Sequence, residues 1–221
     1  MAALLLGSIS VVVDTSELQR EAFNRAFAEH GLDWEWDRSS YTAMLGSNGG
    51  RDRVAAYAES RGEDVDAAAV HATKSRLFQE RLRSGAVEPR PGLLSTIRAA
   101  RDAGHKVVLV TTTSADNLAA LDAALGDALS LADLDLVVDA EQVAAGKPDP
   151  AAYLFALEQL GEEASDCLAV EDNPGGVAAA RAAGVPVAAF PNENTGDQDF
   201  GDAPRVDELD LDTLRGLLPA A

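Results

Sequence analysis

Two short polar segments in the second half of the chain have side chains that could hold a phosphate group. Thr111, Thr112, Thr113 and Ser114 follow an apolar run, so their hydroxyls and free backbone amides could face a ligand where a strand ends. The alternative is that they cap the helix that follows. Further along, Lys147 lies between a glycine and a proline, where a fixed ammonium could neutralise a phosphoryl group or could simply be solvated.

Two further segments carry charge at places where a ligand could bind. Glu171 and Asp172 follow another apolar run and precede a glycine-containing turn, so their carboxylates could hold Mg²⁺ through oxygen ligands or could cap the next helix. In the first half of the chain, Gly49 and Gly50 precede Arg53, and the amides and guanidinium could hold a second anion. The alternative there is an exposed helix start.

The elements that must position these segments alternate between apolar runs and stretches with helical spacing of apolar residues, which is typical of a parallel sheet covered by helices. The expected strands are residues 3–13, 106–111, 134–138, 167–170 and 185–190. Four expected helices interrupt the alternation, at 17–30, 40–45, 51–61 and 66–84. The sequence therefore predicts an α/β core of residues 1–15 and 89–221, with residues 16–88 inserted as a helical cap over the carboxyl ends of the strands, where such sheets bind ligands.

Composition argues against several classes of partner. The chain has 18 Lys and Arg residues against 37 Asp and Glu residues, a net charge of −19, and no segment gathers basic residues into a stripe. Nucleic acids and anionic membranes are therefore not expected partners. The acidic excess fits either adaptation to a high-salt cytoplasm or an ordinary acidic cytosolic protein.

The first thirteen residues and the single cysteine bear on location. The apolar start has no basic residue before it and is shorter than the ~20 residues that span a bilayer, so we interpret it as a core strand. Cys167 lies in an apolar run and has no second cysteine to pair with. A reducing cytoplasm fits. The three histidines fall at helix ends or on polar faces and are expected to be solvated.

The order of the polar segments, hydroxyls, then lysine, then paired acids, each after a strand, resembles the haloacid dehalogenase superfamily. More closely, the chain is similar to its capped β-phosphoglucomutase-like branch and to the xylulose bisphosphatase-like sugar-phosphate phosphatases. The similarity covers nearly the whole chain, and the segments that carry it are Ala22-Phe23-Asn24, Gly31-Leu32-Asp33-Trp34-Glu35-Trp36-Asp37, Gly49-Gly50 with Arg53, Arg90-Pro91-Gly92, Thr111-Thr112-Thr113-Ser114, Gly146-Lys147-Pro148 and Glu171-Asp172-Asn173.

This resemblance implies a Rossmann-like parallel core, a helical cap, Mg²⁺-dependent chemistry and a sugar phosphate enclosed between the two domains. The residues then have expected roles: Thr111, Thr112 and Lys147 would hold a phosphate in the core, Asp172 and Glu171 the Mg²⁺, and Gly49, Gly50, Arg53, Lys74 and Arg90 a second phosphate or sugar hydroxyls from the cap side. In such families one aspartate at the end of the first strand attacks phosphorus, and a second, two residues on, is the general acid and base.

The first motif of this chain departs from that pattern. Aligned without gaps, Gly7 occupies the position of the nucleophile and Ile9 that of the acid and base. Ser10 replaces the glycine that normally follows, while Ser16 and Gln19 replace an acid and a histidine. Ser8 is not expected to stand in, because the two-residue period of a strand points it to the opposite face from positions 7 and 9.

We therefore expect a catalytically impaired or inactive relative, a pseudoenzyme that could still bind a phosphorylated small molecule or a protein partner, with any Mg²⁺ held weakly or not at all. One alternative is an active Mg²⁺-dependent sugar-phosphate phosphatase that uses another nucleophile, or whose reported sequence has an error at residues 7–10. The other is a regulatory or structural protein that keeps only the fold. The oligomeric state is left open.

Overall fold

A five-stranded sheet with every strand parallel forms the centre of the molecule. The computed structural model describes residues 1–45, 49–85 and 87–218. Its strands, β1 (Ala3–Leu6), β2 (Lys106–Val110), β3 (Leu136–Val138), β4 (Cys167–Glu171) and β5 (Val187–Ala189), lie in the order β3-β2-β1-β4-β5. β1 is therefore central, paired with β2 on one side and β4 on the other, and both of its faces are buried, which explains its continuous apolar run.

Helices cover both faces of this sheet. The helices after residue 89 are α6 (Leu93–Asp102), α7 (Ala115–Leu125), α8 (Ala151–Leu160), α9 (Pro174–Ala182) and α10 (Leu211–Arg215). Short 3₁₀ turns occur at Gly126–Ala128, Leu131–Asp133 and Ala164–Asp166. Alternate residues of β1 face opposite layers. Leu4 and Leu6 pack in the cluster that contains Leu93 of α6, whereas Leu5 packs in the cluster that contains Tyr153 of α8.

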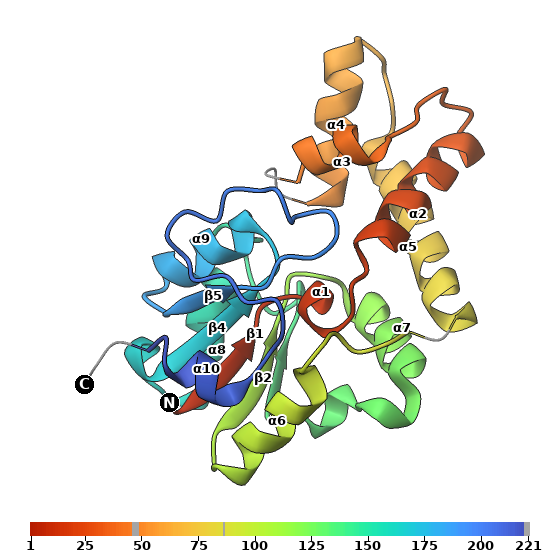
Figure 1. Cartoon of the computed structure of the whole chain (residues 1–221). Coiled ribbons are helices and arrows are strands. Elements are labelled where there is room, and N and C mark those ends of the chain that lie inside the picture. The colour runs from red at the N-terminus through yellow and green to blue at the C-terminus, as the bar shows by residue number, and fades with distance from the viewer. Residues whose placement is uncertain (46–48, 86, 219–221) are drawn as a thin grey trace.

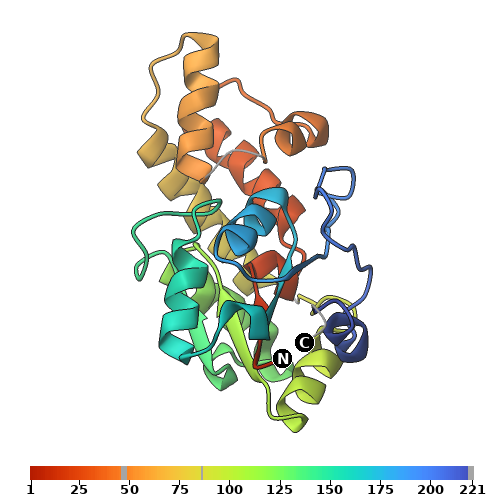
Figure 2. The same cartoon turned by 90° about the vertical axis from the view of Figure 1, so that its left-hand side faces the viewer.

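Four helices between β1 and β2 lie to one side of the sheet, as Figures 1 and 2 show: α2 (Ser16–Glu29), α3 (Arg38–Ala43), α4 (Gly50–Arg61) and α5 (Ala67–Ser84). We call this group the cap. Its centre is aromatic: the rings of Phe27 and Trp36 lie 4.6 Å apart edge to face, and those of Phe23 and Trp36 lie 4.9 Å apart. Asn24 holds the backbone of Trp36 with two side-chain hydrogen bonds, which explains why Ala22-Phe23-Asn24 and the tryptophan-containing segment occur together.

The parallel α/β sheet with covering helices agrees with the fold class expected from the sequence. Four observed strands lie within the expected ranges, and β4 extends one residue beyond its range, to Glu171. The expectation of one strand from residue 3 to residue 13 is wrong in its second half. The strand ends at Leu6, and α1 (Ile9–Val12) follows after two residues. The physical reason is a cap: the Ser8 hydroxyl accepts a hydrogen bond from the Ser10 amide at 3.0 Å and starts a helical turn.

Among the described residues, no helix is both long and apolar enough to cross a membrane.

Candidate active site

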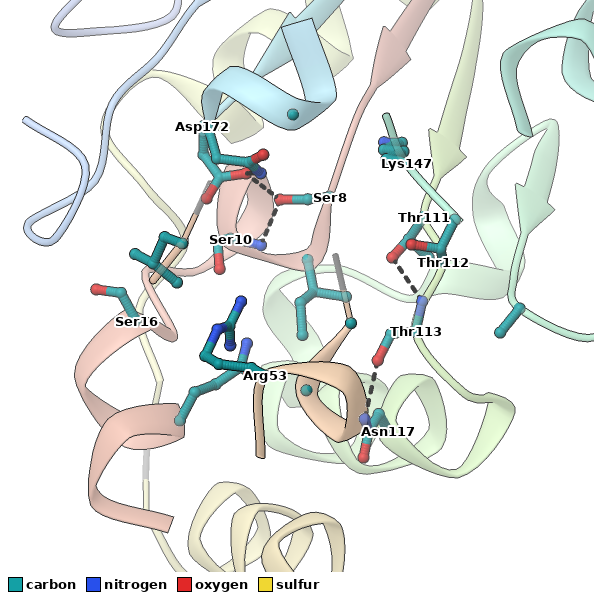
Figure 3. A pocket seen from close by; sticks show the side chains of 18 of the residues that line it. Ser8, Ser10, Ser16, Arg53, Thr111, Thr112, Thr113, Asn117, Lys147 and Asp172 are labelled. Carbon is teal, nitrogen blue, oxygen red and sulfur yellow. Dashed lines mark hydrogen bonds between the residues drawn. The ribbon is translucent and has the colours of Figure 1, made fainter. Parts of the chain in front are cut away.

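A cavity of about 770 Å³ lies between the carboxyl ends of the strands and the cap. Its walls come from segments far apart in sequence: the β1–α1 turn, the first turns of α2, α4 and α7, the middle of α5, and the loops after β4 and β5. Figure 3 shows the core side, with Ser8 and Asp172 on one flank, Lys147, Thr111 and Thr112 on the other, and Arg53 entering from the cap. We call this cavity the pocket.

The threonines after β2 line the pocket as the sequence predicted, and they also hold the start of α7. Thr111 is buried, and its Oγ1 accepts a hydrogen bond from the Thr113 amide at 3.2 Å. Asn117 donates from Nδ2 to the Thr113 hydroxyl at 2.8 Å, and Ser114 caps α7. Both interpretations of this segment therefore coexist: hydroxyls and amides face the pocket, and the same groups cap a helix.

Lys147 also reaches the pocket, but its ammonium is committed to protein acceptors. Nζ donates to the carbonyl oxygens of Gly7 and Val110 and forms an ion pair with Glu171 Oε1 at 2.6 Å. Its three donors therefore have three partners. The ammonium presents positive charge to the pocket wall rather than a free donor.

Glu171, expected as a metal ligand, lies behind the pocket wall and is not among the residues that line the pocket. Its side chain is fully buried, and Oε1 also accepts a hydrogen bond from the Tyr153 hydroxyl at 2.7 Å. Burial raises the pKa of this carboxyl, and the adjacent Lys147 opposes the shift. Burial beside the same carboxylate raises the pKa of Tyr153 well above its usual value.

Two glycines make room for this inward conformation of Glu171. A Cβ on Gly7 would lie 2.2 Å from Glu171 Cδ and 2.5 Å from the Tyr153 hydroxyl. A Cβ on Gly176 would lie 2.0 Å from Glu171 Oε2. The Glu171 carboxylate therefore occupies the space that a side chain at position 7 would need.

Asp172 faces the pocket, but three side-chain donors surround its carboxylate. Oδ1 accepts hydrogen bonds from the Ser8 hydroxyl at 2.6 Å and from Asn173 Nδ2 at 3.0 Å, and Oδ2 accepts one from Asn192 Nδ2 at 2.6 Å. The expectation that Ser8 points to the opposite face is wrong. The strand ends at Leu6, Ser8 is the N-cap of α1, and its hydroxyl points at Asp172 (Figure 3).

The cap side of the pocket is basic. Lys74 is buried between the rings of Phe23 and Phe78, with Nζ 4.9 Å from each ring centroid, and it donates to Gln19 Oε1 at 2.7 Å. Burial, reinforced by the charge of Arg53, lowers the pKa of Lys74 to about 7. Arg53 itself lies 5.5 Å over the Tyr41 ring and donates to the Met44 carbonyl at 3.1 Å. Burial lowers its pKa.

Gly49 and Gly50 line the same wall at the start of α4. His71, expected to be solvated, lies against them: an added Cβ on Gly50 would approach its ring to 2.7 Å. Burial, together with Lys74 and its neighbouring arginines, lowers the pKa of His71 to about 4, so the ring is neutral at pH 7. The sequence interpretation of His71 is therefore wrong, because the cap folds this part of α5 over the pocket.

Arg90, like Glu171, is an expected site residue that does not line the pocket. Its guanidinium donates to the carbonyl oxygens of Ser10, Phe190 and Pro191, at 3.3, 2.8 and 2.5 Å, and stacks 3.3 Å over the Phe190 ring. Burial lowers its pKa. Arg90 therefore joins the returning end of the cap to the core and is not placed to touch a ligand.

Sequence reasoning also missed the loop after β5. Asn192 and Thr195 line the pocket, and Thr195 Oγ1 donates to the Asp172 carbonyl at 2.6 Å. A usable signal was present, because the polar run Asn192-Glu193-Asn194-Thr195 follows the apolar strand β5, which is the neighbour of β4.

Comparison with known proteins identifies the relatives of this chain. The sequence profile of the haloacid dehalogenase-like hydrolases matches residues 9–184. The chain is 40% identical to the plasmid-encoded protein CbbY of Cupriavidus necator over 210 residues, which is 90% of this chain and 82% of that protein. It is 36% identical to CbbY of Rhodobacter capsulatus over 206 residues, 92% of this chain and 91% of the relative.

Solved structures agree with the sequence matches. A mutant of CbbY from Rhodobacter sphaeroides, with one aspartate changed to asparagine and in complex with xylulose-(1,5)bisphosphate, superposes with a TM-score of 0.86 at 32% identity, covering 94% of each chain. β-Phosphoglucomutase from Clostridium difficile shares the fold at 15% identity, with a TM-score of 0.79 and coverage of 99% of this chain and 97% of the other.

Proposed function

The chain belongs to the haloacid dehalogenase-like hydrolase family and has the phosphatase scaffold of its CbbY relatives, and on that premise we propose that it binds a phosphorylated small molecule of the sugar-phosphate class, with hydrolysis impaired or absent. The observation that carries the proposal is the charge of the pocket. Among the described lining residues, Arg51, Arg53, Lys74 and Lys147 are basic, whereas only two residues are acidic, in a chain of net charge −19.

The proposed binding rests on polar and basic groups in the pocket wall. The hydroxyls and amides around Thr111 and Thr112 face a pocket that is large enough for a sugar phosphate. Arg53 and Lys74 approach from the opposite wall, so a ligand with two anionic groups could bridge core and cap. A relative crystallised with a bisphosphate while one of its aspartates was changed to asparagine, which supports binding that survives the loss of a carboxylate.

The proposed loss of hydrolysis rests on the absence of reactive side chains at residues 7 and 9. Gly7 has no side chain to attack phosphorus, and Ile9 has no group that can protonate a leaving oxygen, although both line the pocket. Removal of a nucleophile costs on the order of 10⁶ in turnover in other enzymes. Glu171 does not replace it, because the carboxylate is buried against Lys147 and Tyr153.

A second candidate is a working phosphatase, and one observation favours it. The Ser8 hydroxyl lies in the pocket and donates to Asp172 Oδ1 at 2.6 Å. A hydroxyl beside a carboxylate is the arrangement of a nucleophile and its base. In this candidate the Ser8 oxygen would attack phosphorus and pass its proton to Asp172. The bond between phosphorus and the sugar oxygen would break, the leaving oxygen would take up that proton, and water would then release phosphate from Ser8.

A cytoplasmic location belongs to the same proposal. The one cysteine, Cys167, is free and buried, and burial raises the pKa of its thiol to about 11. Nothing in its surroundings requires an oxidising compartment.

The first test measures binding and turnover together. Isothermal titration calorimetry with xylulose 1,5-bisphosphate, and with unphosphorylated xylulose as the matched ligand, should detect binding of the bisphosphate alone. Lys74→Met should weaken it about 10-fold to 100-fold through loss of a charged contact, whereas the control Lys106→Met, distant from the pocket, should leave it unchanged. Equal binding of the two ligands, or no binding of either, would contradict the proposal and favour the alternative of a protein that keeps only the fold.

The same samples should release no phosphate above the buffer rate. Release that disappears in Ser8→Ala would establish the second candidate instead. Release that persists in Ser8→Ala would contradict both assignments, and sequencing the gene across codons 7–10 would then test the reported residues.

A further inference from the structure

The family implies a Mg²⁺ ion, and the acidic groups around the pocket do not fit one. Mg²⁺ requires several oxygen ligands with free lone pairs in near-octahedral positions. Residues 7 and 9 supply no carboxylate, and Glu171 is turned behind the wall into its ion pair with Lys147. Across residues 1–45, 49–85 and 87–218, no group of three or more His, Cys, Asp or Glu side chains is placed to hold a metal.

Asp172, the one carboxylate of the set that faces the pocket, is already satisfied by hydrogen-bond donors. Ser8, Asn173 and Asn192 donate to its two oxygens at 2.6, 3.0 and 2.6 Å. Three donors therefore occupy three of the roughly four lone-pair sites of the carboxylate, which leaves few oxygen ligands for a cation. In Figure 3 the Ser8 hydroxyl points at Asp172 from the turn that carries Gly7 and Ile9.

These bonds give Asp172 a different task. Asn192 binds it from the loop after β5, and the Thr195 hydroxyl of the same loop donates to its carbonyl oxygen. That loop also reaches the cap, because Asn194 donates to Glu17 at 2.7 Å and Gln198 to the Thr42 carbonyl at 2.9 Å. The Asp172 carboxylate therefore anchors both the β1–α1 turn and a loop that spans from the core to the cap.

The core side of this chain carries fewer negative charges than the first motif of the family would give it. Loss of two aspartates removes two negative charges, which is the charge that a divalent cation would have neutralised. Lys147 neutralises Glu171, so Asp172 remains as a single negative charge beside any bound anion. Such a charge weakens anion binding unless a cation lies between the two.

We propose that the pocket binds its anionic ligand without a divalent cation, and that Asp172 is a positioning residue for Ser8 and the loop 190–198 rather than a metal ligand. This rests on the anion binding proposed above. If Asp172 held a metal ion, Asp172→Asn would weaken anion binding. Without a metal, the substitution keeps the shape and one acceptor but removes a like charge, so it should tighten anion binding.

The first arm of the test uses the full chain and inorganic phosphate at pH 8, titrated by calorimetry in EDTA and in excess MgCl₂. The dissociation constant should be the same in both, and Asp172→Asn should bind phosphate about fivefold or more tightly in EDTA. Asp102→Asn, an exposed acid at the end of α6 away from the pocket, is the matched control and should bind as the native chain does. A Mg²⁺-dependent affinity, or weaker binding by Asp172→Asn, would overturn the inference.

The second arm needs no anion. Mn²⁺ alone is titrated into the native chain and into Asp172→Asn, and free Mn²⁺ is followed by electron paramagnetic resonance. The two proteins should give the same curve, and a Mn²⁺ site that disappears in Asp172→Asn would overturn the inference. If phosphate and the bisphosphate both fail to bind, the proposed function fails while this arm still decides the metal question.

Discussion

Position 7 shows how one missing side chain reorganises its surroundings. With only a hydrogen at Gly7, the Glu171 carboxylate, the Tyr153 hydroxyl and the Lys147 ammonium share one small buried space. A buried acid is stable there because it is paired and hydrogen-bonded. The absence of a side chain at position 7 and the inward conformation of Glu171 are therefore linked.

Gly7→Ala should destabilise the protein by about 1–3 kcal/mol, because its Cβ would overlap Glu171 Cδ. In a Glu171→Ala background the same substitution should cost much less, so the two changes couple in a double-mutant cycle followed by urea unfolding. Gly146→Ala is the control, since its Cβ meets only the Thr112 hydroxyl, at 3.9 Å. Equal costs at positions 7 and 146 would show that the space behind Gly7 is not occupied.

Lys74 should make anion binding depend on pH. Burial lowers its pKa to about 7 from 10.5, so between these values the unfolded chain holds one more proton and rising pH favours the folded state. The pH dependence of anion binding is the opposite: affinity falls as pH rises, because an anion binds more tightly to protonated Lys74. His71, with a pKa of about 4, stays neutral above pH 6. The other charged side chains that line the pocket are Arg51, Arg53, Asp52, Lys147 and Asp172.

Sulfate, which is a dianion throughout, should therefore bind about tenfold more weakly at pH 8.5 than at pH 6. Lys74→Arg keeps the charge at both pH values and should bind sulfate with nearly constant affinity. Calorimetry at the two pH values measures this. An unchanged pH profile in Lys74→Arg would assign the titration to another group.

At the scale of elements, buried hydrogen bonds of Arg90 join the segment that returns from the cap to the core. Arg90 donates to three carbonyl oxygens, two of them at the end of β5, and its own amide donates to the Val12 carbonyl at the end of α1. The returning segment, α1 and the loop after β5 therefore meet at one side chain. This explains why an arginine stands there without touching the pocket.

Arg90→Met should lower the free energy of unfolding by about 1–3 kcal/mol, because it leaves buried carbonyl oxygens without a donor. Arg98→Met, on the exposed face of α6, should change it by less than about 0.5 kcal/mol. Ligand affinity should fall less than in Lys74→Met, since Arg90 does not line the pocket. Chemical denaturation and calorimetry of the same samples separate the two effects, and a loss of affinity with unchanged stability would return Arg90 to the binding site.

At the scale of the whole molecule, the charge of the pocket wall is opposite to the net charge of the chain. The chain carries −19 overall, yet basic residues outnumber acidic ones among the described residues of the pocket wall. An acidic exterior keeps polyanions away, while a basic interior accepts a small anion that can enter. The contrast arises only because the cap folds Arg53 and Lys74 over the strand ends that carry Lys147.

The sequence alone was sufficient for the layout of the chain. Strand-length apolar runs and helical periodicity identified the parallel sheet and the four helices of the cap, because both signals are local. The polar segments after β2 and β4 were located for the same reason, since the carboxyl ends of parallel strands share one edge of the sheet. The absence of aspartates at positions 7 and 9 is likewise a property of the sequence.

Only the tertiary structure decided where the side chains of that edge point. Whether Glu171 faces a metal or Lys147 depends on space created at Gly7 and Gly176, which are far from each other in the chain. Ser8 meets Asp172 because a hydrogen bond to the Ser10 amide ends the strand early, against the apolar pattern. Such outcomes follow from packing and hydrogen bonds between distant segments, and no local periodicity contains them.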